Sequence, residues 1–369
     1  MQAVILVGGE GTRLRPLTST VPKPVVALVD RPLMAYMFEW LHGHGVDDVI
    51  MSCGFKATKV RDVLGDGSRY GIRLRFVEEP DPRGTAGALK FAEALLEDRF
   101  LMLNGDVLTD LDLGAQIAQH EATAATGTLA LVPVPDPSSY GLVRLRDGGA
   151  VAEFLEKPSA DTVLDTNLIS AGAYVLERSV LDLIVPDRNV SIEREIWPAL
   201  VDEGLYGFVD AAAYWIDVGT PERYLQATFD ILEGYVRTGV VAKLGDGYLS
   251  IDPTAQIDGR AVPPAILGAG ARVAAGARVG SLAVLGEDVA IGAGSSVERA
   301  VVLAGAHVGE GCVLRDCIVG PGARIGDRSQ IIGGAMVGEG VIIGADNVIA
   351  HGARLFPGLE VPDGGLVFP

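Results

Sequence analysis

Two neighbouring segments near the N-terminus carry residues suited to binding phosphate. The apolar run AVILV at residues 3–7 is followed by GGEGTRLRPLT at residues 8–18, and VPKP follows at residues 21–24. Closely spaced glycines let backbone amides approach a phosphate without obstruction, and Arg13 and Arg15 then supply positive charge. The prolines on either side of Lys23 stiffen the backbone that presents it, which suits a cation aimed at a phosphoryl oxygen. Either segment alone is also typical of a turn with solvated cations, whereas the pair favours phosphate binding. Neither matches GxGxxG or the GxxxxGK[ST] P-loop.

The first 235 residues alternate short β-rich runs with amphipathic helical stretches. Helices are expected over residues 32–43 and 85–97, between apolar runs such as DVIMSCG, IRLRFV and FLML. Such alternation predicts a mostly parallel sheet covered by helices, and ligands of these sheets bind beyond the carboxyl ends of the strands. The sequence NGD at residues 104–106 follows FLML directly, so we expect it at the same edge of the sheet as residues 8–18.

From about residue 260, aliphatic residues recur at every sixth position in glycine-rich sequence. With a five-residue step before Val302 and another before Val319, the register contains Leu267, Val273, Val279, Leu285, Ile291, Val297, Val302, Val308, Leu314, Val319, Ile325, Ile331, Val337, Ile343 and Ile349. Nine of these are followed directly by glycine, which an amphipathic helix does not tolerate repeatedly because each interior glycine costs about 1 kcal/mol. A period of six instead predicts a parallel β-helix of triangular coils, with the aliphatic residues stacked inside. A flexible glycine-rich linker would have no reason to keep these residues in register.

Composition argues against several classes of function. There are 30 basic and 48 acidic residues, and the resulting net charge of −18 disfavours a nucleic-acid or anionic-membrane surface. Cys53, Cys312 and Cys317 are too few for a disulfide framework and form no CxxC pair, which fits a reducing compartment. No apolar stretch approaches the roughly 18 residues that a membrane helix needs, and no basic region precedes the first apolar run. We therefore expect a cytoplasmic protein with no nucleic-acid or membrane partner.

Further motifs follow one another along residues 1–225. They are Gly84-Thr85-Ala86-Gly87, Asn104-Gly105-Asp106, Glu156-Lys157-Pro158, Ala171-Gly172-Ala173-Tyr174, Ser191-Ile192-Glu193-Arg194-Glu195 and Trp215-Ile216-Asp217-Val218-Gly219-Thr220. Together with the G-x-G-T-R-L-x-P-L-T loop and P-K-P, this series resembles the sugar-1-phosphate nucleotidyltransferases, also called NDP-sugar pyrophosphorylases. The resemblance implies an α/β fold with a Rossmann-like mixed, mostly parallel sheet, and the tail resembles the left-handed β-helix of many members. We expect a catalytic domain over residues 1–236, a connecting segment over 237–260 and the β-helix over 261–369.

The resemblance implies a role for each matching residue in joining a nucleoside triphosphate to a sugar-1-phosphate. The residues implied in nucleotide binding are Gly8, Gly9, Gly11, Thr12, Glu79, Gly84 and Thr85, and those implied in catalysis are Arg13, Lys23, Asp106 and Asp217. The sugar phosphate would be bound by Glu156, Lys157, Ser170 and Gly172. Asp106 and Asp217 match the carboxylates that hold a catalytic Mg²⁺, a metal that typically uses one or two carboxylates together with substrate phosphates. Two polyanionic substrates that meet on so acidic a protein need such a cation.

Glu79 bears on the choice of base. It stands where relatives that use pyrimidine nucleotides carry Gln, and a carboxylate only accepts hydrogen bonds, which suits the adjacent N1–H and N2–H donors of guanine. The expected nucleotide is therefore GTP, and the motifs look most like those of the mannose-1-phosphate guanylyltransferases. Ser170 departs from the Asn that many of those carry before Ala-Gly, so a glucose-type or cyclitol phosphate stays open.

Three other interpretations compete with this one. A uridylyl- or thymidylyltransferase for glucose-1-phosphate is the alternative within the same reaction class. A bifunctional enzyme whose β-helix also transfers acyl groups would need a general base, for which His307 and His351 are the histidines available in that region. A regulatory homologue that binds the nucleotide sugar is expected to lose the Arg, Lys or Asp positions, and all of them are present. We also expect a homo-oligomer that assembles partly through the β-helix, because its coils end in Gly- and Pro-rich sequence rather than a polar cap.

Overall fold

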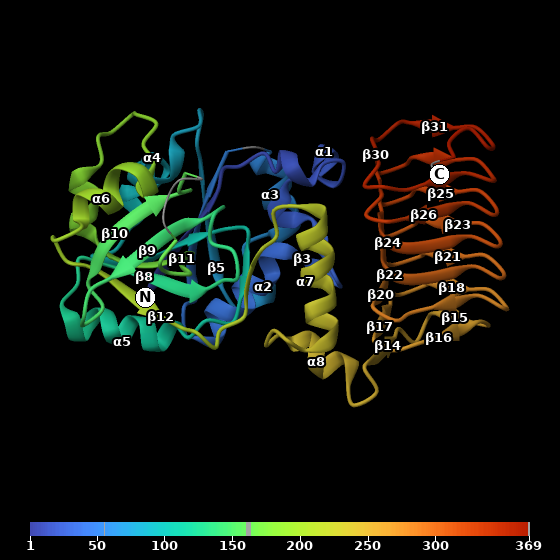
Figure 1. Ribbon diagram of the computed structural model, residues 1–369, viewed down its shortest axis with the longest axis horizontal. Coiled ribbons are helices and arrows are strands. Elements are labelled where there is room, and N and C mark those ends of the chain that lie inside the picture. Colours follow the sequence, from blue (N-terminus) through green and yellow to red (C-terminus); the bar gives the residue numbers. More distant parts are fainter. Residues whose placement is uncertain (55, 160–163, 368–369) are drawn as a thin grey trace. The chain divides into compact units, whose positions relative to one another are not determined.

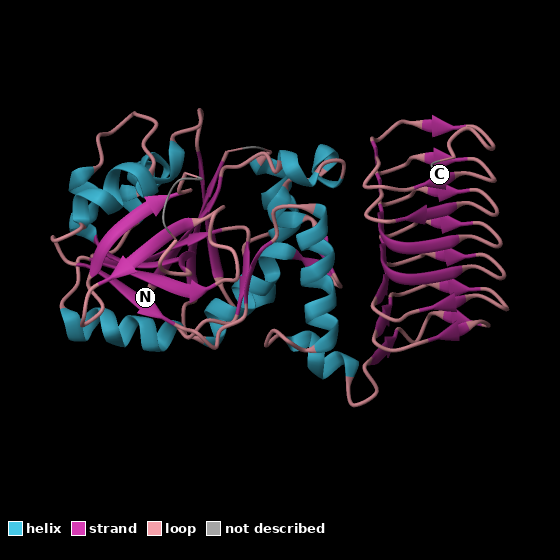
Figure 2. Ribbon diagram, in the orientation of Figure 1, coloured by secondary structure: helices cyan, strands magenta, loops and turns pink. Residues whose placement is uncertain are grey.

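The apolar run near the N-terminus forms β1 (Gln2–Val7), a central strand of a nine-stranded sheet (Figures 1 and 2). The structure is a computed structural model that describes residues 1–54, 56–159 and 164–367. The chain divides into two compact units. The first consists of Met1–Gly9 and Met34–Trp215, and the second of Glu10–Leu33 and Ile216–Pro369.

The sheet of the first unit runs in the order β10-β9-β11-β6-β1-β4-β5, and β8 pairs with β11 and β12. Its other strands are β4 (Asp48–Cys53), β5 (Arg73–Glu78), β6 (Arg99–Asn104), β8 (Gly127–Pro133), β9 (Gly141–Leu145), β10 (Val151–Glu156), β11 (Leu168–Glu177) and β12 (Leu205–Val209). β1 pairs in parallel with β4 and β6, and β4 pairs in parallel with β5. The carboxyl ends of these four strands therefore lie at one edge, as the alternation of strands and helices predicts. β11 is antiparallel to β6, β8 and β9, so the expected mixed α/β sheet is confirmed.

Both expected helices of the first unit are present. α2 (Leu33–Gly43) matches the prediction closely, whereas α4 (Gly84–Phe91) is followed by a separate 3-10 turn at Glu93–Leu95. Further helices are α3 (Ala57–Leu64), α5 (Leu113–Thr123) and α6 (Trp197–Leu200), and β7 (Val107–Thr109) is a short strand. The core includes the buried rings of Tyr174 and Trp197, whose centroids lie 5.0 Å apart.

The C-terminal strands stack in the coils of a parallel β-helix (Figure 1), and their pairings divide them among three faces. The first face consists of β14 (Leu249–Ile251), β17 (Ala265–Leu267), β20 (Ala283–Leu285), the second halves of β22 (Ser296–Val302) and β24 (Val313–Val319), β27 (Met336–Val337) and β30 (Arg354–Leu355). The second face consists of β15 (Gln256–Ile257), β18 (Arg272–Val273), β21 (Ala290–Ile291), β23 (His307–Val308), β25 (Arg324–Ile325), β28 (Ile342–Ile343) and β31 (Glu360–Val361). The third consists of β16 (Arg260–Ala261), β19 (Arg278–Val279), the first halves of β22 and β24, β26 (Gln330–Ile332) and β29 (Val348–Ile349).

The predicted six-residue register is confirmed in the interior of the β-helix. All fifteen predicted aliphatic residues are buried in one apolar cluster, which continues through Leu355 and Val361 in the last coil. Steric crowding between coils explains why glycines follow many of these residues. A Cβ on Gly326, for example, would lie 2.5 Å from the backbone nitrogen of Ala345 in the next coil. The coils therefore stack too closely at such corners to accept a side chain.

The two five-residue steps also have a structural cause. At these steps β22 and β24 continue across a corner from the third face to the first instead of ending there. Arg299 and Asp316 occupy the two corners with φ of 49° and 48°, and Arg299 Nε donates to Asp316 Oδ1 at 2.7 Å. Cys53, Cys312 and Cys317 form no disulfide, as expected, and all three are buried.

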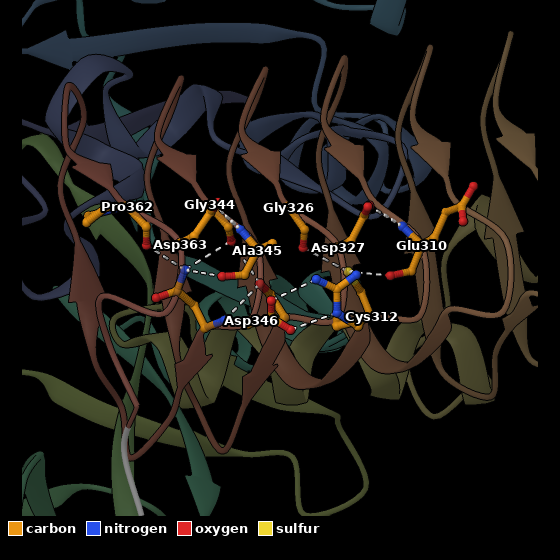
Figure 3. Close-up of polar contacts among 12 residues, drawn as sticks. Glu310, Cys312, Gly326, Asp327, Gly344, Ala345, Asp346, Pro362 and Asp363 are labelled. Atoms are coloured by element: carbon orange, nitrogen blue, oxygen red, sulfur yellow. Dashed lines mark hydrogen bonds and ion pairs between the residues drawn. The ribbon is translucent and has the colours of Figure 1, made fainter.

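Polar side chains join successive turns of the β-helix (Figure 3). The backbone nitrogen of Glu310 donates to Asp327 Oδ1 at 2.9 Å, and that of Ala345 donates to Asp363 Oδ1 at 2.7 Å. The buried Asn347 amide donates to the carbonyl oxygens of Gly344, Ala345 and Pro362. These bonds satisfy backbone groups at the corners and tie each coil to the next.

Besides the β-helix, the second unit contains two stretches of sequence, one before and one after residues 34–215 of the first unit. Its remaining elements are α1 (Leu17–Thr20), β2 (Ala27–Leu28), β3 (Arg31–Pro32), α7 (Pro221–Glu233) and α8 (Gly239–Leu244). α7 packs against β22 and β24, and the Arg299 guanidinium lies 4.5 Å from the centroid of the Phe229 ring. Among the described residues, none of the helices has the length and apolar character needed to cross a membrane.

Candidate active site

Three expected site residues lie at the carboxyl edge of the parallel strands in the first unit. Gly8 follows β1, Glu79 follows β5, and Asp106 comes two residues after β6. The registers of β1, β4, β5 and β6 bring these strand ends side by side. A Cβ on Gly54, just after β4, would lie only 3.2 Å from the carbonyl oxygen of Gly8. At this edge the backbone of Gly8 and that of Gly54 are therefore in close contact, on strands that lie between those leading to Asp106 and Glu79.

Glu79 is a nearly buried carboxylate, with 9% of its surface exposed. Ser52 Oγ donates to Glu79 Oε1 at 2.8 Å, and the backbone nitrogen of Glu79 donates to the Cys53 carbonyl oxygen at 2.8 Å. A Cβ on Gly8 would lie 3.8 Å from the same Oε1 atom. Burial, aided by the Glu79 carboxylate, raises the pKa of the Cys53 thiol to about 12. The pair of Ser52 and Glu79 therefore presents an oriented acceptor beside Gly8, the first residue of the glycine loop at residues 8–18.

Gly105 fixes the turn that carries Asp106. Its backbone nitrogen donates to the Leu6 carbonyl oxygen at 3.1 Å, which holds the turn against β1. A Cβ at this position would lie 2.3 Å from Val7 Cγ1, so only glycine fits. The position of Asp106 is thus set by the backbone contact between β1 and the end of β6.

Gly172 lies where β11 shifts its register against β8. Residues 168–170 and 174–176 pair with β8 on the two sides of the shift, while the other edge of β11 passes from β9 at Ile169 to β6 over residues 173–177. Gly172 has φ of 75°, and a Cβ there would lie 3.0 Å from the Cβ of Asn104. The bend therefore places Gly172 directly against the residue that begins the NGD turn. Ser170, in the same bend, shares a 2.9 Å hydrogen bond with the hydroxyl of the buried Tyr174.

Gly84 and Thr85 begin α4 and are held by the segment that contains Ser191 and Glu193. Gly84 has φ of 70°, and a Cβ there would lie 2.5 Å from the Val190 carbonyl oxygen. Thr85 Oγ1 donates to Glu193 Oε2 at 2.8 Å and accepts from the backbone nitrogen of Ile192 at 2.8 Å. The Thr85 hydroxyl thus connects α4 to the Ser-Ile-Glu-Arg-Glu motif, a use that the sequence does not indicate.

Glu156 and Lys157 end β10 near a second carboxylate, Glu193. Burial, followed by the repulsion of the Glu193 carboxylate, raises the pKa of Glu156, and Lys157 partly opposes this effect. Lys157 Nζ lies 3.7 Å from Glu156 Oε1, and Lys157 has φ of 48°. Most of the Lys157 side chain is exposed, whereas most of that of Glu156 is covered. The pair offers an exposed cation beside an acceptor, which suits a phosphate next to sugar hydroxyls.

Replacing Glu156 by glutamine should raise the unfolding temperature above pH 7. A carboxyl whose pKa is raised on folding stabilises the fold while it is protonated, and this contribution is lost as the pH rises through its folded pKa. The neutral amide does not ionise, so the variant should not lose this stability. Its gain in unfolding temperature should vanish below about pH 4, where free Glu is protonated. Thermal unfolding of the variant and the unmodified protein at several pH values measures this gain. Glu153→Gln in the same strand, which breaks an ion pair with Arg144, serves as control and should give no such gain.

In the second unit, the glycine loop packs against the segment that carries Lys23. Gly11 has φ of 64°, Thr12 begins the 3-10 turn Thr12–Leu14, and Thr18 Oγ1 donates to the Gly11 carbonyl oxygen at 2.7 Å. A Cβ on Gly11 would lie 3.2 Å from the Cβ of Lys23, whose side chain is nearly buried with 9% exposed. The two phosphate-binding segments predicted from the sequence are therefore neighbours within one unit.

Arg13 and Asp217 meet at Gly219 in the same unit. A Cβ on Gly219 would lie 3.0 Å from Arg13 Nη2 and 3.1 Å from Asp217 Oδ2. Asp217 also forms an ion pair with Arg223, and its side chain is 15% exposed. Thr220 caps α7, because its side chain accepts from the backbone nitrogen of Arg223. Arg223 is a residue that sequence reasoning missed, although its place in the first turn after the Trp-Ile-Asp-Val-Gly-Thr motif is a usable signal.

The expected site residues are thus shared between the two units. The first unit carries Gly8, Gly9, Glu79, Gly84, Thr85, Asp106, Glu156, Lys157, Ser170 and Gly172, and the second carries Gly11, Thr12, Arg13, Lys23 and Asp217. Within the described residues, no group of three or more His, Cys, Asp or Glu side chains could hold a metal on its own. A metal bound by one or two carboxylates would need further ligands from its substrates.

The fold and these loops define a nucleotidyltransferase with a β-helix domain. A family model described as "Nucleotidyl transferase" matches residues 2–234, and a model described as "GMPPB C-terminal domain" matches residues 249–363. The chain belongs to the nucleotidyl transferase family, and the resemblance expected from its motifs is confirmed.

Several relatives show how far the similarity extends. The mannose-1-phosphate guanylyltransferase of Mycobacterium tuberculosis is 37% identical over 81% of this chain and 83% of its own length. The mannose-1-phosphate guanylyltransferase catalytic subunit beta of Danio rerio is also 37% identical, over 70% and 73% of the two chains. The UTP–glucose-1-phosphate uridylyltransferase of Synechocystis is 30% identical over 82% of each. A crystal structure of HddC from Yersinia pseudotuberculosis complexed with GMP-PN has a TM-score of 0.53 and 30% identity, covering 61% of this chain and 97% of that one.

Proposed function

We propose that this nucleotidyltransferase transfers GMP from GTP to mannose-1-phosphate, which yields GDP-mannose and pyrophosphate. The observation that carries the proposal is the nearly buried Glu79 carboxylate beside Gly8 at the end of β5. Ser52 orients one carboxylate oxygen, and the group retains lone pairs for the adjacent N1–H and N2–H donors of guanine. Uracil and thymine present a carbonyl acceptor at their edge, which a carboxylate would repel.

Names of relatives support the same substrates. Proteins named mannose-1-phosphate guanylyltransferase match most of this chain, and the similar HddC crystal structure is a complex with GMP-PN. The Synechocystis relative, which is named for UTP and glucose-1-phosphate, supports a second candidate. Ser170 supports the same candidate, because it differs from the Asn of many guanylyltransferases. The two candidates share one mechanism and differ in the base and the sugar.

The reaction needs positioning and charge stabilisation rather than a general base. The phosphate of a sugar-1-phosphate has a second pKa of about 6 and is ionised at neutral pH. One of its oxygens attacks the α-phosphorus of the nucleotide in line, a P–O bond forms, and the bond to the departing pyrophosphate breaks. In this proposal Arg13 and Lys23 hold the triphosphate, Lys157 holds the sugar phosphate, and Glu156 and Gly172 border the sugar.

Asp106 and Asp217 are proposed as ligands of Mg²⁺. Each offers hard carboxylate oxygens from a constrained backbone: Gly105 fixes the first, and a 2.8 Å bond from the Gly219 nitrogen to the Asp217 carbonyl fixes the second. When bound, Mg²⁺ neutralises phosphate charge that would otherwise repel the attacking sugar phosphate. We further propose a cytoplasmic homo-oligomer that assembles partly through the β-helix, where Phe356, Leu359 and Val367 are exposed apolar side chains in the last coils.

The proposed function is tested by pyrophosphate release. Five nucleoside triphosphates are combined with mannose-, glucose-, N-acetylglucosamine- and galactose-1-phosphate in the presence of Mg²⁺. Release confined to GTP with mannose-1-phosphate supports the proposal. Release with UTP or dTTP and glucose-1-phosphate would keep the mechanism and replace the substrates, and no release with any pair would contradict the proposal.

Glu79→Gln should shift the preference of the enzyme from GTP toward UTP or dTTP. The amide can donate as well as accept, so it loses complementarity to guanine and gains it to a pyrimidine edge. The ratio of kcat/KM values for GTP and UTP should fall by about ten- to a hundredfold. Glu78→Gln, at the adjacent exposed position, is the matched control and should leave the ratio unchanged. An unchanged ratio in Glu79→Gln would reject base recognition by this carboxylate.

A further inference from the structure

Arg354 interrupts a regular pattern on the first face of the β-helix. On this face the residue before each interior aliphatic points outward, because side chains alternate along a strand. In five successive coils this outward residue is apolar and buried: Ile266, Val284, Val301, Ile318 and Met336. Parallel pairing places Arg354 directly after Met336 in this series. The next coil therefore presents an exposed guanidinium where these five present packed apolar side chains, and β14, at the other end of the face, has Ser250 at this position.

The Arg354 guanidinium reaches the backbone of the glycine loop. Its Nη1 atom donates to the Arg13 carbonyl oxygen at 2.9 Å and to the Arg15 carbonyl oxygen at 3.2 Å. These carbonyls lie at the end of the 3-10 turn Thr12–Leu14, whose last carbonyls have no partner within the turn and can accept from a cation. One side chain thus holds both sides of Leu14, within the segment that presents the Arg13 side chain to Asp217 and Gly219.

Packing nearby is incomplete, which gives this polar contact more weight. A cavity of about 220 Å³ separates the chain from Leu17 to Ala27 from the β-helix corners at Leu303, Pro321 and Glu339. Close packing is therefore incomplete between those corners and the stretch that follows the Gly11–Arg15 loop. The hydrogen bonds from Arg354, one coil further along, supply a fixed point at the end of the loop that precedes Pro16.

We propose that Arg354 is a positioning residue for the nucleotide, through which the last coils of the β-helix hold the Gly11–Arg15 loop in its binding conformation. The proposal rests on the proposed function, since it takes this loop to bind the triphosphate. It gives the β-helix a part in substrate binding that is separate from any role in assembly. The side chain of Arg354 acts through backbone carbonyls, so its loss should affect binding of the nucleotide and spare the sugar phosphate.

The test compares Arg354→Met with Arg324→Met in the full-length chain. Methionine matches Met336 in the preceding coil of the same face, so it suits the strand. Arg324 likewise precedes an interior aliphatic residue on the second face, and its side chain makes no hydrogen bond or ion pair with the described residues. Arg354→Met should raise KM for the nucleotide about tenfold, with kcat and KM for the sugar phosphate within about twofold. Arg324→Met should leave all three constants unchanged.

Amide hydrogen exchange without substrates provides a second readout. The backbone nitrogens of Leu14 and Arg15 donate to the carbonyls of Gly11 and Thr12, so their exchange reports on the turn. Exchange at both should quicken in Arg354→Met and not in Arg324→Met. Unchanged nucleotide KM and unchanged exchange, or a lower unfolding temperature alone, would overturn the proposal. If the unmodified chain releases no pyrophosphate with any nucleotide, the proposed function fails, and the exchange experiment still decides whether Arg354 anchors the loop.

Discussion

Replacing Asp217 by asparagine should lower Mg²⁺-dependent turnover by about a thousandfold and leave the unfolding temperature close to that of the unmodified protein. The amide keeps the size of the side chain and one oxygen, but it loses the charge that a hard divalent cation requires. It also leaves Arg13 and Arg223 without the carboxylate between them. Because this ion pair is partly exposed, its loss should cost little stability. Pyrophosphate release at saturating substrates, measured over a range of Mg²⁺ concentrations, checks the expected loss.

Asp30→Asn provides the matched control for this variant. Asp30 lies in the same unit, its side chain is 12% exposed, and it pairs with Arg31 and Lys243. Burial alone would raise the pKa of Asp30, but hydrogen bonds and ion pairs with those two cations lower it. Because these ion pairs are also partly exposed, its neutralisation should lower the unfolding temperature only slightly, and only above about pH 4, while sparing turnover. Two aspartates of similar burial would then differ in turnover and not in stability. Retention of turnover within tenfold in Asp217→Asn would reject this residue as a metal ligand.

The β-helix could be predicted almost residue by residue because its interior repeats locally. Each hexapeptide must place one aliphatic residue inward, so the period alone identifies Leu267 through Ile349 as interior positions, and the structure confirms all fifteen. The two five-residue steps were visible as breaks in that period. Their cause was not, because strands that continue across a corner depend on the positive φ of Arg299 and Asp316 and on the bond between them.

The candidate site could be predicted where a motif lies at the end of a strand. Parallel strands bring their carboxyl ends to one edge, so the positions of Gly8 and Asp106 follow from the order of the elements. Arg354 was not predicted because its partners are set by packing between distant segments. Arg223, by contrast, follows its partner Asp217 closely in the sequence and was missed despite that local signal. The bonds from Arg354 to Arg13 and Arg15 cross more than three hundred residues of sequence. No local pattern distinguishes that arginine from Arg324, which also precedes an interior aliphatic residue.

Gly172→Ala should reduce turnover by about a hundredfold and also lower stability, because the new methyl group meets the start of the NGD turn. A Cβ at this position lies 3.0 Å from both Cβ and Nδ2 of Asn104, so Asn104 must shift. Such a shift moves the backbone that leads through Gly105 to Asp106, and displacements of about 1 Å in a reacting centre cost on the order of a hundredfold. The φ of 75° adds about 1–2 kcal/mol of backbone strain.

Gly148→Ala separates the strain from the steric contact. Gly148 has φ of 87°, and a Cβ there would meet nothing within 4 Å. This variant should lose about the same 1–2 kcal/mol to strain while keeping full turnover. Chemical denaturation and pyrophosphate release on both variants give the comparison. If Gly172→Ala keeps the turnover of Gly148→Ala, then Asn104 yields without moving Asp106, and the bend in β11 does not position the catalytic turn. A loss confined to Gly172→Ala would instead place the bend, with its shift of register against β8, among the features that set the geometry of the reacting centre.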